Sequence, residues 1–413
     1  MRILYECDLA GSKYHGMAYR IFQFSSEFVK QGHDVMVVAA SYSHTRKINP
    51  EVTKQLTDEK IDDVKYKWIK TPKYKKNDRR RVLHIFIYNI KLWFYADKIA
   101  GEFKPDVVIS SGVTPFDFIG CNRIAKKANA SILYEVGDLW PLTLIELGGF
   151  SPKHPFIRVM QFAENYAYKN ADTVVSLLPC AEDYMKKHGL KDNKFSYIPN
   201  GIMIDDWKNQ KKLPEEHDSL IRKLKNKFLI GYTGAHSIAN SLKSIIDAVS
   251  LLKTDDIVLL LVGNGTEKDN LIKYVKDSKI ENVYFLPPIQ KIEIPSFLVK
   301  MDILYVGFKN QSIYRFGISP NKLFDYMMAG KPIIQAIKAG NNLVEEADCG
   351  LFAEPEDPEA ISGAIIRLKD MTVEQRKKMG DNGRKYVVNN HSYTILTEKY
   401  INIIVNVLKE KLT

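Results

Sequence analysis

Residues 319–332 read SPNKLFDYMMAGKP, a pattern that predicts a short helix with a signal at each end. Ser319 is a favoured N-cap residue, and Pro320 suits the first helical position. Gly330 is a common residue just past the end of a helix. The stretch therefore predicts a helix over Pro320–Ala329.

The start of this helix predicts an anion-binding site. Asn321, Lys322 and Asp325 share one face near the N-terminus, where backbone N–H groups and the helix dipole favour an anion such as a diphosphate. Lys322 adds a positive charge, and the Asp325 carboxylate can accept hydrogen bonds from ribose hydroxyls. For the isolated stretch, the alternative is a plain capped helix with an ion pair between Lys322 and Asp325. The surrounding sequence has to decide between the two.

The composition is typical of a globular protein with two domains. The chain has 413 residues, of which 45% are hydrophobic and 26% charged. Its first residues resemble a β-strand rather than a signal peptide, and no apolar run approaches the roughly 20 residues that span a bilayer. The four cysteines match no zinc or redox spacing. We expect a cytoplasmic protein with reduced thiols.

A net charge of +11 calls for an anionic partner. Much of the positive charge lies in residues 65–98, where basic residues alternate with the aromatic residues Trp68, Tyr74, Phe86, Tyr88, Trp93, Phe94 and Tyr95. This combination predicts peripheral contact with an anionic membrane surface, at the inner face of the cell membrane. The alternative is a solvated basic loop followed by an ordinary packed helix. Nucleic acid is not expected as a partner, because no RNA-binding signature accompanies the charge.

Short β-branched runs alternate with helical patterns along the first half of the chain. Strands are expected at Ile3–Glu6, Asp34–Ala39, Val64–Ile69, Asp106–Ser110, Ser131–Glu135, Thr173–Ser176 and Phe195–Ile198. Helices are expected near Ala18–Gln31, Val82–Phe103, Phe116–Ala128, Phe156–Lys169 and Ala181–Lys187. Such alternation implies a parallel sheet with helices on both faces, and ligands bind beyond the carboxyl ends of its strands.

The second half repeats the pattern after a polar stretch, Asp205–Lys225, that is interpreted as a linker or hinge. Its strands are expected at Lys227–Tyr232, Ile257–Val262, Val283–Phe285, Ile303–Val306 and Pro332–Gln335. The sequence thus predicts an α/β protein with two Rossmann-like parallel-sheet domains that face each other across a cleft. The domains are expected over residues 1–200 and 201–392, and a C-terminal helix, 393–413, is expected to cross back and pack on the first domain.

Glycine turns follow several of these strands. The loop after the first strand carries Gly11 and Gly16 just before a helix, without the GxGxxG fingerprint of dinucleotide sites. In the second half, Gly231–Gly234 and Val258–Gly265 end neighbouring strands. Each turn alone is ordinary strand-to-helix chemistry. Together with residues 319–332, they predict glycine turns and a helix N-terminus at one sheet edge, around one ligand.

The order of these motifs resembles the GT-B glycosyltransferases, in particular the retaining family 4. The shared features are the first glycine loop, IPNGI at 198–202, GYTG at 231–234, LLLVGNG at 259–265, LPPIQ at 286–290 and SPNKLFDYMMAGKPII from Ser319. The form of the last motif, together with DLWP at 138–141, is most similar to the transferases of fucosamine and related amino sugars in surface-polysaccharide assembly. The resemblance implies an N-terminal acceptor-binding domain and a C-terminal nucleotide-sugar-binding domain.

The resemblance also implies roles for single residues. Asp325 would hold the ribose, the backbone around Ile318–Lys322 the diphosphate, and the backbone at Pro288 and Ile289 would read the base. The implied donor-binding residues are Gly16, Thr233, Gly234, Pro288, Ile289, Ile318, Ser319, Asn321, Lys322 and Asp325. Lys322 and Asp138 are the implied catalytic residues, with Asp138 orienting the acceptor or stabilising positive charge on the sugar. A structural role in capping a turn is the alternative for Asp138.

Several positions depart from the family pattern. Gly317 stands at the first acidic position of the E-x7-E motif, so the usual contact to the donor sugar is absent. Ala235 and Asn240 replace the Arg and Lys that commonly follow the strand–glycine turn. Lys322, and Arg315 as a further diphosphate contact, are expected to compensate for that missing charge.

The resemblance implies retaining transfer from a nucleotide diphosphate sugar, with UDP expected, to a polyprenyl-diphosphate-linked glycan of an O-antigen, capsule or similar surface polysaccharide. The leaving diphosphate would accept the acceptor proton, so neither a cofactor nor a metal is expected. Two alternatives stay open. One is a UDP-sugar 2-epimerase of the same fold, and the other is a non-catalytic nucleotide-sugar-binding subunit.

Overall fold

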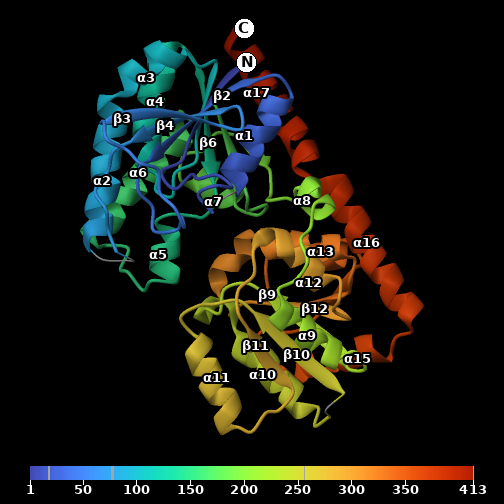
Figure 1. Cartoon of the computed structure of the whole chain (residues 1–413). Helices are drawn as coiled ribbons and strands as arrows, with labels where there is room; N and C mark the ends of the chain where they lie inside the picture. The colour runs from blue at the N-terminus through green and yellow to red at the C-terminus, as the bar shows by residue number, and fades with distance from the viewer. Residues whose placement is uncertain (17–18, 76–78, 255, 413) are drawn as a thin grey trace. The chain divides into compact units, whose positions relative to one another are not determined.

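The computed structural model describes residues 1–16, 19–75, 79–254 and 256–412. The chain forms two compact units, one made of Met1–Pro199 with Tyr393–Thr413 and the other of Asn200–Ser392. Each unit is an α/β domain built on a parallel sheet (Figure 1). We describe the two units separately.

The first unit is built on an eight-stranded sheet in the described part of the chain, ordered β3-β4-β2-β1-β5-β6-β7-β8. Its strands are β1 (Arg2–Glu6), β2 (Asp34–Ala40), β3 (Leu56–Ile61), β4 (Val64–Ile69), β5 (Val107–Ser110), β6 (Ser131–Val136), β7 (Thr173–Ser176) and β8 (Phe195–Tyr197). All neighbours pair in parallel except β3 and β4. The central strands are apolar runs buried on both faces, as parallel sheets require.

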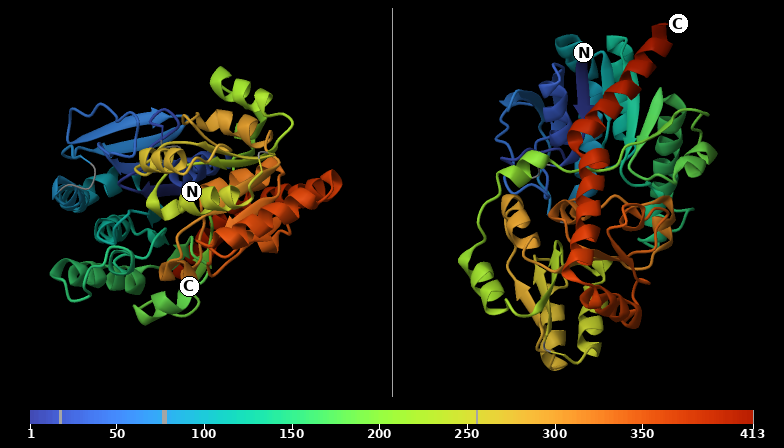
Figure 2. Two further views of the ribbon diagram at one scale, coloured as in Figure 1. Left: turned by 90° about the horizontal axis from the view of Figure 1, so that it is seen from below. Right: turned by 90° about the vertical axis from the view of Figure 1, so that its right-hand side faces the viewer.

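Helices cover both faces of this sheet. They are α1 (Arg20–Lys30), α2 (Arg79–Phe94), α3 (Ala96–Phe103), α4 (Asp117–Ala128), α5 (Leu142–Glu146), α6 (Pro155–Asn170), α7 (Glu182–Lys187) and the C-terminal α17 (Tyr393–Leu412). The last helix lies beside α1 (Figure 1, with further views in Figure 2). There Thr394 donates to Glu27, and the Tyr400 ring meets Phe24 edge-on at 5.3 Å. Within the described residues, no helix is both long and apolar enough to cross a bilayer.

Three details of the first unit differ from the sequence prediction. The strand β3 was missed because it is polar and reaches β4 through Asp62 and Asp63, both with positive φ, instead of a glycine turn. The single helix expected over Val82–Phe103 is two helices, which meet at Tyr95. The expected start of the first helix at Ala18 lies outside the described residues.

The second unit is built on a six-stranded parallel sheet among the described residues, ordered β11-β10-β9-β12-β13-β14. Its strands are β9 (Phe228–Thr233), β10 (Ile257–Val262), β11 (Val283–Leu286), β12 (Ile303–Gly307), β13 (Ile333–Ala336) and β14 (Gly350–Phe352). Its helices are α8 (Ile204–Lys208), α9 (Glu215–Lys223), α10 (Leu242–Leu251), α11 (Lys268–Asp277), α12 (Ile294–Leu298), α13 (Asn321–Ala329), α14 (Leu343–Glu346), α15 (Pro358–Asp370) and α16 (Val373–His391).

The polar stretch Asp205–Lys225, interpreted from the sequence as a linker or hinge, is instead part of the second unit. It contributes to α8 and forms α9, and both helices bury apolar side chains in the core of the second unit. Trp207 is 8% exposed and Ile221 is 7% exposed. Most residues of these two short helices are charged or polar, so the composition of the stretch did not indicate its few buried apolar residues.

Candidate functional site

The loops that follow β9, β10 and β11 meet at the carboxyl edge of the second sheet. The Gly234 N–H donates to the Val262 carbonyl at 3.0 Å, and the His236 N–H donates to the Asn264 carbonyl at 2.9 Å. The Lys268 ammonium bridges the next pair of loops, because it donates to the carbonyls of Gly263 and Leu286. The convergence of glycine turns expected from the sequence is therefore present.

Glycine is required where these loops touch. A Cβ on Gly263 would lie 1.9 Å from the Gly234 carbonyl oxygen, and a Cβ on Gly265 would lie 2.2 Å from the His236 carbonyl oxygen. Gly234 and Gly263 also have φ values of 146° and 150°, which side chains disfavour. These glycines let one backbone pack directly on the next.

Lys322 points from the first turn of α13 toward the β9 loop. Its ammonium lies 2.9 Å from the Tyr232 hydroxyl and 2.6 Å from the Asn240 amide oxygen. It also lies over the Tyr232 ring, 4.5 Å from the centroid. A Cβ on Gly234 would come within 3.1 Å of the ammonium. The glycine thus leaves room for the lysine, whose hydrogen-bond partners, Tyr232 and Asn240, are neutral.

Burial lowers the pKa of Lys322 to about 7, because taking an ammonium out of water disfavours its charged form. None of the groups that shift this pKa is a carboxylate. An anion placed beside Lys322 would favour the protonated form and raise the pKa again. Within the described part of the chain, the site therefore holds a lysine without a carboxylate partner, which suits a phosphate ligand.

The start of α13 differs from the sequence prediction at two residues. Pro320, not Ser319, is the N-cap residue, and the Ser319 hydroxyl instead accepts the Asn200 N–H at 2.8 Å. From the sequence, the Ile318 N–H was expected to bind the diphosphate. This N–H instead donates to the Asn341 side chain and is not available to a ligand. The N–H groups of Ser319, Asn321 and Lys322 have no acceptor among the described residues.

Asp325 lies one turn further along α13 and is 4% exposed. Its carboxylate pairs with Lys291, just past the LPPIQ motif that contains Pro288 and Ile289. The alternative interpretation of the helix, a plain capped helix with an ion pair between Lys322 and Asp325, is therefore wrong in this detail. Within the described residues, the other carboxylate oxygen of Asp325, Oδ1, is buried without a hydrogen-bond partner. Among these residues, Oδ1 thus lacks the hydrogen bond that a buried carboxylate oxygen normally accepts.

Tyr326 joins α13 to the β9 loop. Its hydroxyl accepts the Thr233 N–H at 2.8 Å and donates to the Thr233 carbonyl at 3.2 Å. Sequence reasoning missed Tyr232, Tyr326, Lys291 and Asn341, because their roles depend on contacts between loops. The only local signal was their place within or just beyond the predicted motifs.

Arg315 and Gly317 lie on the loop before α13. The Arg315 guanidinium is exposed, donates to the Ser312 carbonyl at 2.7 Å and covers the Phe316 ring. Gly317 has φ 102° and ψ 171°, a backbone region in which other residues are strained. The absence of the family's glutamate is therefore accompanied by a loop conformation that favours glycine.

His236 is a further candidate that the sequence analysis did not choose. It is fully buried beside the rings of Tyr232 and Phe285, and neither ring nitrogen has a hydrogen-bond partner among the described residues. Burial, together with the charges of Lys268 and Lys322, lowers its pKa to about 4. His236 is therefore neutral at physiological pH and adds no charge to the site.

Two predicted residues, Gly16 and Asp138, belong to the first unit. Gly16 is exposed with φ 69°, and Asp138 is exposed in the turn after β6. Both lie beyond the carboxyl ends of strands in their own sheet, β1 and β6. Their roles toward a donor or acceptor stay predictions.

Within the described residues, no group of three or more His, Cys, Asp and Glu side chains is arranged to hold a metal ion. The site at α13 offers a cation, helix N–H groups and one carboxylate oxygen instead. Such a set can bind a diphosphate through charge and N–H groups and a hydroxyl through the carboxylate.

Two glycosyltransferase families match adjoining parts of the chain. The family described as Glycosyltransferase Family 4 matches residues 14–206, and the one described as Glycosyl transferases group 1 matches residues 215–386. The chain has the GT-B glycosyltransferase fold. The second match contains the candidate site at α13 and its neighbouring loops.

The curated relatives are distant. The chain is 26% identical over 210 residues to the "Putative teichuronic acid biosynthesis glycosyltransferase TuaH" of Bacillus subtilis (strain 168), over 49% of each chain. It is 22% identical over 304 residues to the "Putative colanic acid biosynthesis glycosyl transferase WcaI" of Escherichia coli (strain K12), over 69% of this chain and 71% of the relative. The first match thus spans about half the length of that relative.

Solved GT-B structures match over nearly the whole chain at low identity. Sucrose-phosphate synthase from Thermosynechococcus elongatus has a TM-score of 0.72 at 15% identity, covering 99% of each chain. The Anabaena protein HepE in complex with UDP-glucose has a TM-score of 0.66 at 14% identity, covering 99% of this chain and 100% of its own. At such identities, the likeness concerns the fold alone.

Proposed function

We propose that the protein is a retaining glycosyltransferase that moves a sugar from a nucleotide diphosphate sugar, UDP-linked, to a glycan acceptor. The observation that carries the proposal is the Lys322 ammonium, which has neutral partners and lies on the first turn of α13. The diphosphate would lie against the N–H groups of Ser319, Asn321 and Lys322 and against the ammonium. The UDP-glucose in the structure of HepE supports this choice of donor class.

The nucleoside part of the donor would be held by the neighbouring residues. The free carboxylate oxygen of Asp325 would accept a hydrogen bond from a ribose hydroxyl. The ion pair between Lys291 and Asp325 would keep the loop with Pro288 and Ile289 beside the base. Because Gly317 offers no side chain, recognition of the donor sugar would come from other residues. Arg315 would be a further contact to the diphosphate.

Catalysis would rest on stabilising the charge that grows on the leaving diphosphate. Preorganised N–H groups and cations do this well, and removal of one such donor typically costs about 10²–10³ in rate. Lys322 would supply the cation, and no metal or cofactor would be required. Asp138 of the first unit would orient the acceptor hydroxyl or stabilise positive charge on the sugar.

The acceptor would be a lipid-linked glycan of surface-polysaccharide assembly, carried on a polyprenyl diphosphate. The names of the two curated relatives, which refer to the biosynthesis of teichuronic acid and colanic acid, support this class. The motif form at Ser319 supports an amino sugar such as fucosamine as the transferred group. An O-antigen or capsule would be the product, made at the inner face of the cell membrane.

Exposed apolar side chains on α2 support contact with a membrane. Val82, Phe86, Ile90 and Trp93 follow one another at helical spacing, and each is 39% exposed or more. The helix carries no acidic residue, so its charge is complementary to anionic lipid. The membrane-facing part of residues 65–98 would therefore be α2.

Other aromatic residues of that segment do not face solvent. Trp68 and Tyr88 are fully buried and Tyr74 is 4% exposed, so they belong to the core of the first unit. Residues 76–78 of the segment lie outside the described residues. Within residues 79–98, the exposed aromatic side chains are Phe86, Trp93 and Phe94.

A panel of nucleotides and nucleotide sugars, read by thermal shift, tests the proposal. Selective stabilisation by UDP and a UDP-sugar is expected, and no response to any nucleotide would contradict the proposed site. Incubation with donor alone then separates the alternatives, because an epimerised donor would identify a 2-epimerase. Nucleotide binding without transfer to any acceptor and without donor hydrolysis would identify a non-catalytic subunit.

A further inference from the structure

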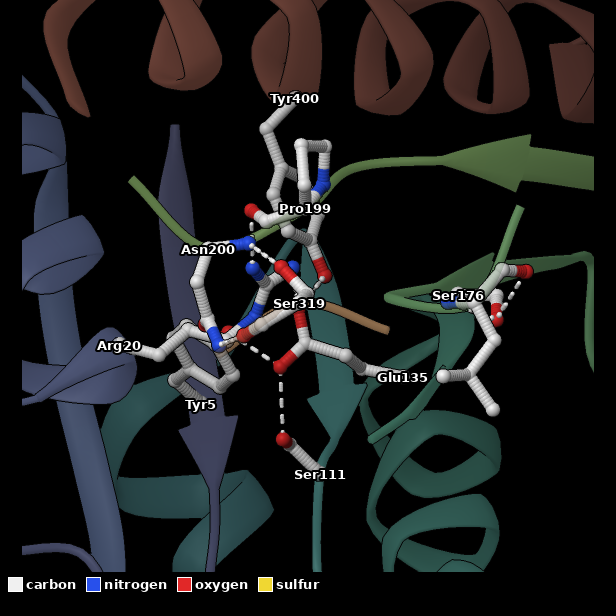
Figure 3. A network of polar contacts seen from close by, with 10 residues as sticks. Tyr5, Arg20, Ser111, Glu135, Ser176, Pro199, Asn200, Ser319 and Tyr400 are labelled. Carbon is white, nitrogen blue, oxygen red and sulfur yellow. Dashed lines mark hydrogen bonds and ion pairs between the residues drawn. The ribbon is translucent and has the colours of Figure 1, made fainter. Parts of the chain in front are cut away.

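The chain passes from the first unit to the second at the Pro199–Asn200 peptide, and side chains hold both residues of this peptide. In the first unit, Arg20 donates to the Pro199 carbonyl at 2.6 Å, and the same guanidinium forms a buried ion pair with Glu135 at 2.8 Å (Figure 3). A hydrogen bond from a charged donor is stronger than one between neutral groups. The Pro199 carbonyl is therefore firmly placed.

Glu135 has a full set of partners that fixes the direction of Arg20. Its carboxylate accepts hydrogen bonds from Tyr5 at 2.7 Å, Ser111 at 2.7 Å and Tyr400 at 3.2 Å. Arg20 and these hydrogen bonds hold the pKa of Glu135 below its usual value, although burial alone would raise it. The network therefore keeps an ionised carboxylate opposite Arg20.

In the second unit, Asn200 holds Ser319 with two hydrogen bonds. Its backbone N–H donates to the Ser319 hydroxyl at 2.8 Å, and its side-chain amide donates to the Ser319 carbonyl at 2.7 Å (Figure 3). Asn200 is 9% exposed. Ser319 directly precedes the N-cap of α13, so these bonds set where the first turn of the helix begins.

We propose that Asn200 is a positioning residue that couples the nucleotide affinity of the second unit to the first unit through the Pro199–Asn200 peptide. A shift of this peptide would move Ser319, and with it the N–H groups that face the donor diphosphate. A misplacement of about 1 Å at a reacting centre can cost about 10² in rate. The proposal rests on the proposed function, since it takes the start of α13 as the diphosphate site.

The chain offers a matched control in Asn341. This asparagine holds the residue before Ser319, Ile318, with two side-chain hydrogen bonds: its amide oxygen accepts the Ile318 N–H at 2.8 Å, and its amide nitrogen donates to the Ile318 carbonyl at 3.1 Å. Asn341 lies after β13, well inside the second unit, and not on the segment that joins the units. Asn341 therefore supports the same loop but has no part in the proposed coupling through the Pro199–Asn200 peptide.

A double-mutant cycle on the full chain tests the coupling, with UDP affinity measured by calorimetry. Asn200→Ala should weaken UDP binding about fivefold, because the side-chain hydrogen bond to the Ser319 carbonyl is lost while the backbone N–H still donates to the Ser319 hydroxyl. Arg20→Lys keeps a charge for Glu135 but loses the fork that reaches Pro199, and should weaken binding about threefold. In the Asn200→Ala/Arg20→Lys double variant, UDP binding should be weakened by less than the product of the two single effects. Effects of Asn341→Ala and Arg20→Lys should instead multiply.

A second measurement needs no change at Arg20. Because coupling between binding free energies is reciprocal, saturating UDP should slow amide hydrogen exchange in α1 around Arg20 in the wild type and not in Asn200→Ala. Wild-type UDP affinity in Asn200→Ala, fully multiplicative effects in the first cycle, or equal protection of α1 in both proteins would each overturn the coupling. A wild type that binds no nucleotide would instead overturn the proposed function.

Discussion

The Lys322 ammonium lies 2.6 Å from the amide oxygen of Asn240. Position 240 is one of two at which the family that the sequence resembles commonly carries a cation, yet here the cation comes from α13. Asn240 is 7% exposed, and its amide nitrogen donates to Ser237 at 2.8 Å. The charge is thus supplied to the β9 loop by a different element of the same unit.

Exchange of the side chains at positions 322 and 240 should restore the turnover that Lys322→Asn alone removes. Lys322→Asn should lower turnover by about 10²–10³. In the Lys322→Asn/Asn240→Lys double variant, the ammonium returns to the same loop, and turnover should recover to within about tenfold of the wild type. Steady-state transfer kinetics measure this.

Lys338→Ala is the control for this exchange, since Lys338 is exposed and pairs with Glu354. It should leave turnover unchanged. A double variant no faster than Lys322→Asn would show that an ammonium returned to the β9 loop from position 240 does not restore turnover, and would contradict this prediction.

UDP affinity should fall as the pH rises above about 7. Burial lowers the pKa of Lys322 to about 7, so the free protein loses this proton near neutrality, whereas a bound diphosphate favours the protonated form. Binding above pH 7 therefore takes up a proton and weakens up to about tenfold per pH unit. Calorimetry in buffers of different ionisation enthalpy counts the proton, and Lys322→Arg should abolish the uptake.

The same lysine should make the stability of the free protein depend on pH. An unfolded lysine keeps its proton up to about pH 10.4, so between pH 7 and that value the unfolded state binds more protons than the folded state. The free energy of unfolding should therefore rise across this range relative to Lys322→Met. Urea titrations of both proteins at pH 7 and pH 9 measure the difference, and equal changes would contradict the lowered pKa.

Asp325→Asn should weaken UDP binding about tenfold or more, because a hydrogen bond to a charged acceptor is lost. The binding of 2′-deoxy-UDP and 3′-deoxy-UDP locates the contact. The wild type should bind UDP more tightly than one of these two deoxy analogues, the one that lacks the hydroxyl bound by Asp325. Asp325→Asn should bind UDP and that analogue equally. Lys291 is itself partly exposed and can be hydrated once its partner is lost, so the fold should remain. An unchanged preference for both hydroxyls would remove Asp325 from the ribose site.

Vesicle flotation tests the exposed face of α2. The Phe86→Ser/Ile90→Ser/Trp93→Ser variant should lose binding to vesicles rich in phosphatidylglycerol, and wild-type binding should fall as salt is raised. Val373→Ser in the second unit, where Val373 is 67% exposed, is the control and should bind as the wild type does. Failure of the wild type to float at low salt would contradict the membrane contact.

The convergence of loops at the second sheet could be predicted from the sequence, because parallel strands place their carboxyl ends at one edge. GYTG and VGNG meet as expected, backbone against backbone, at Gly234 and Gly263. The partners of Lys322 could not be predicted in this way. These partners are Tyr232 and Asn240, which lie far from α13 along the chain.

Ser319 and Trp68 show why local patterns were insufficient. Ser319 fits the N-cap pattern, yet its hydroxyl accepts from Asn200, a residue 119 positions away. Trp68 fits a membrane-surface pattern of bases and aromatics, yet it lies on β4 and is fully buried. In both cases, a distant contact outweighed the local preference of the residue.

The edges of the first sheet bear on how the protein behaves at high concentration. On one side, β3 exposes three charged residues in a row, Asp58, Glu59 and Lys60. On the other side, β8 is only three residues long. Both features disfavour the addition of a strand from another molecule. Replacement of the β3 charges by threonine or valine should therefore promote aggregation without touching the ligand site.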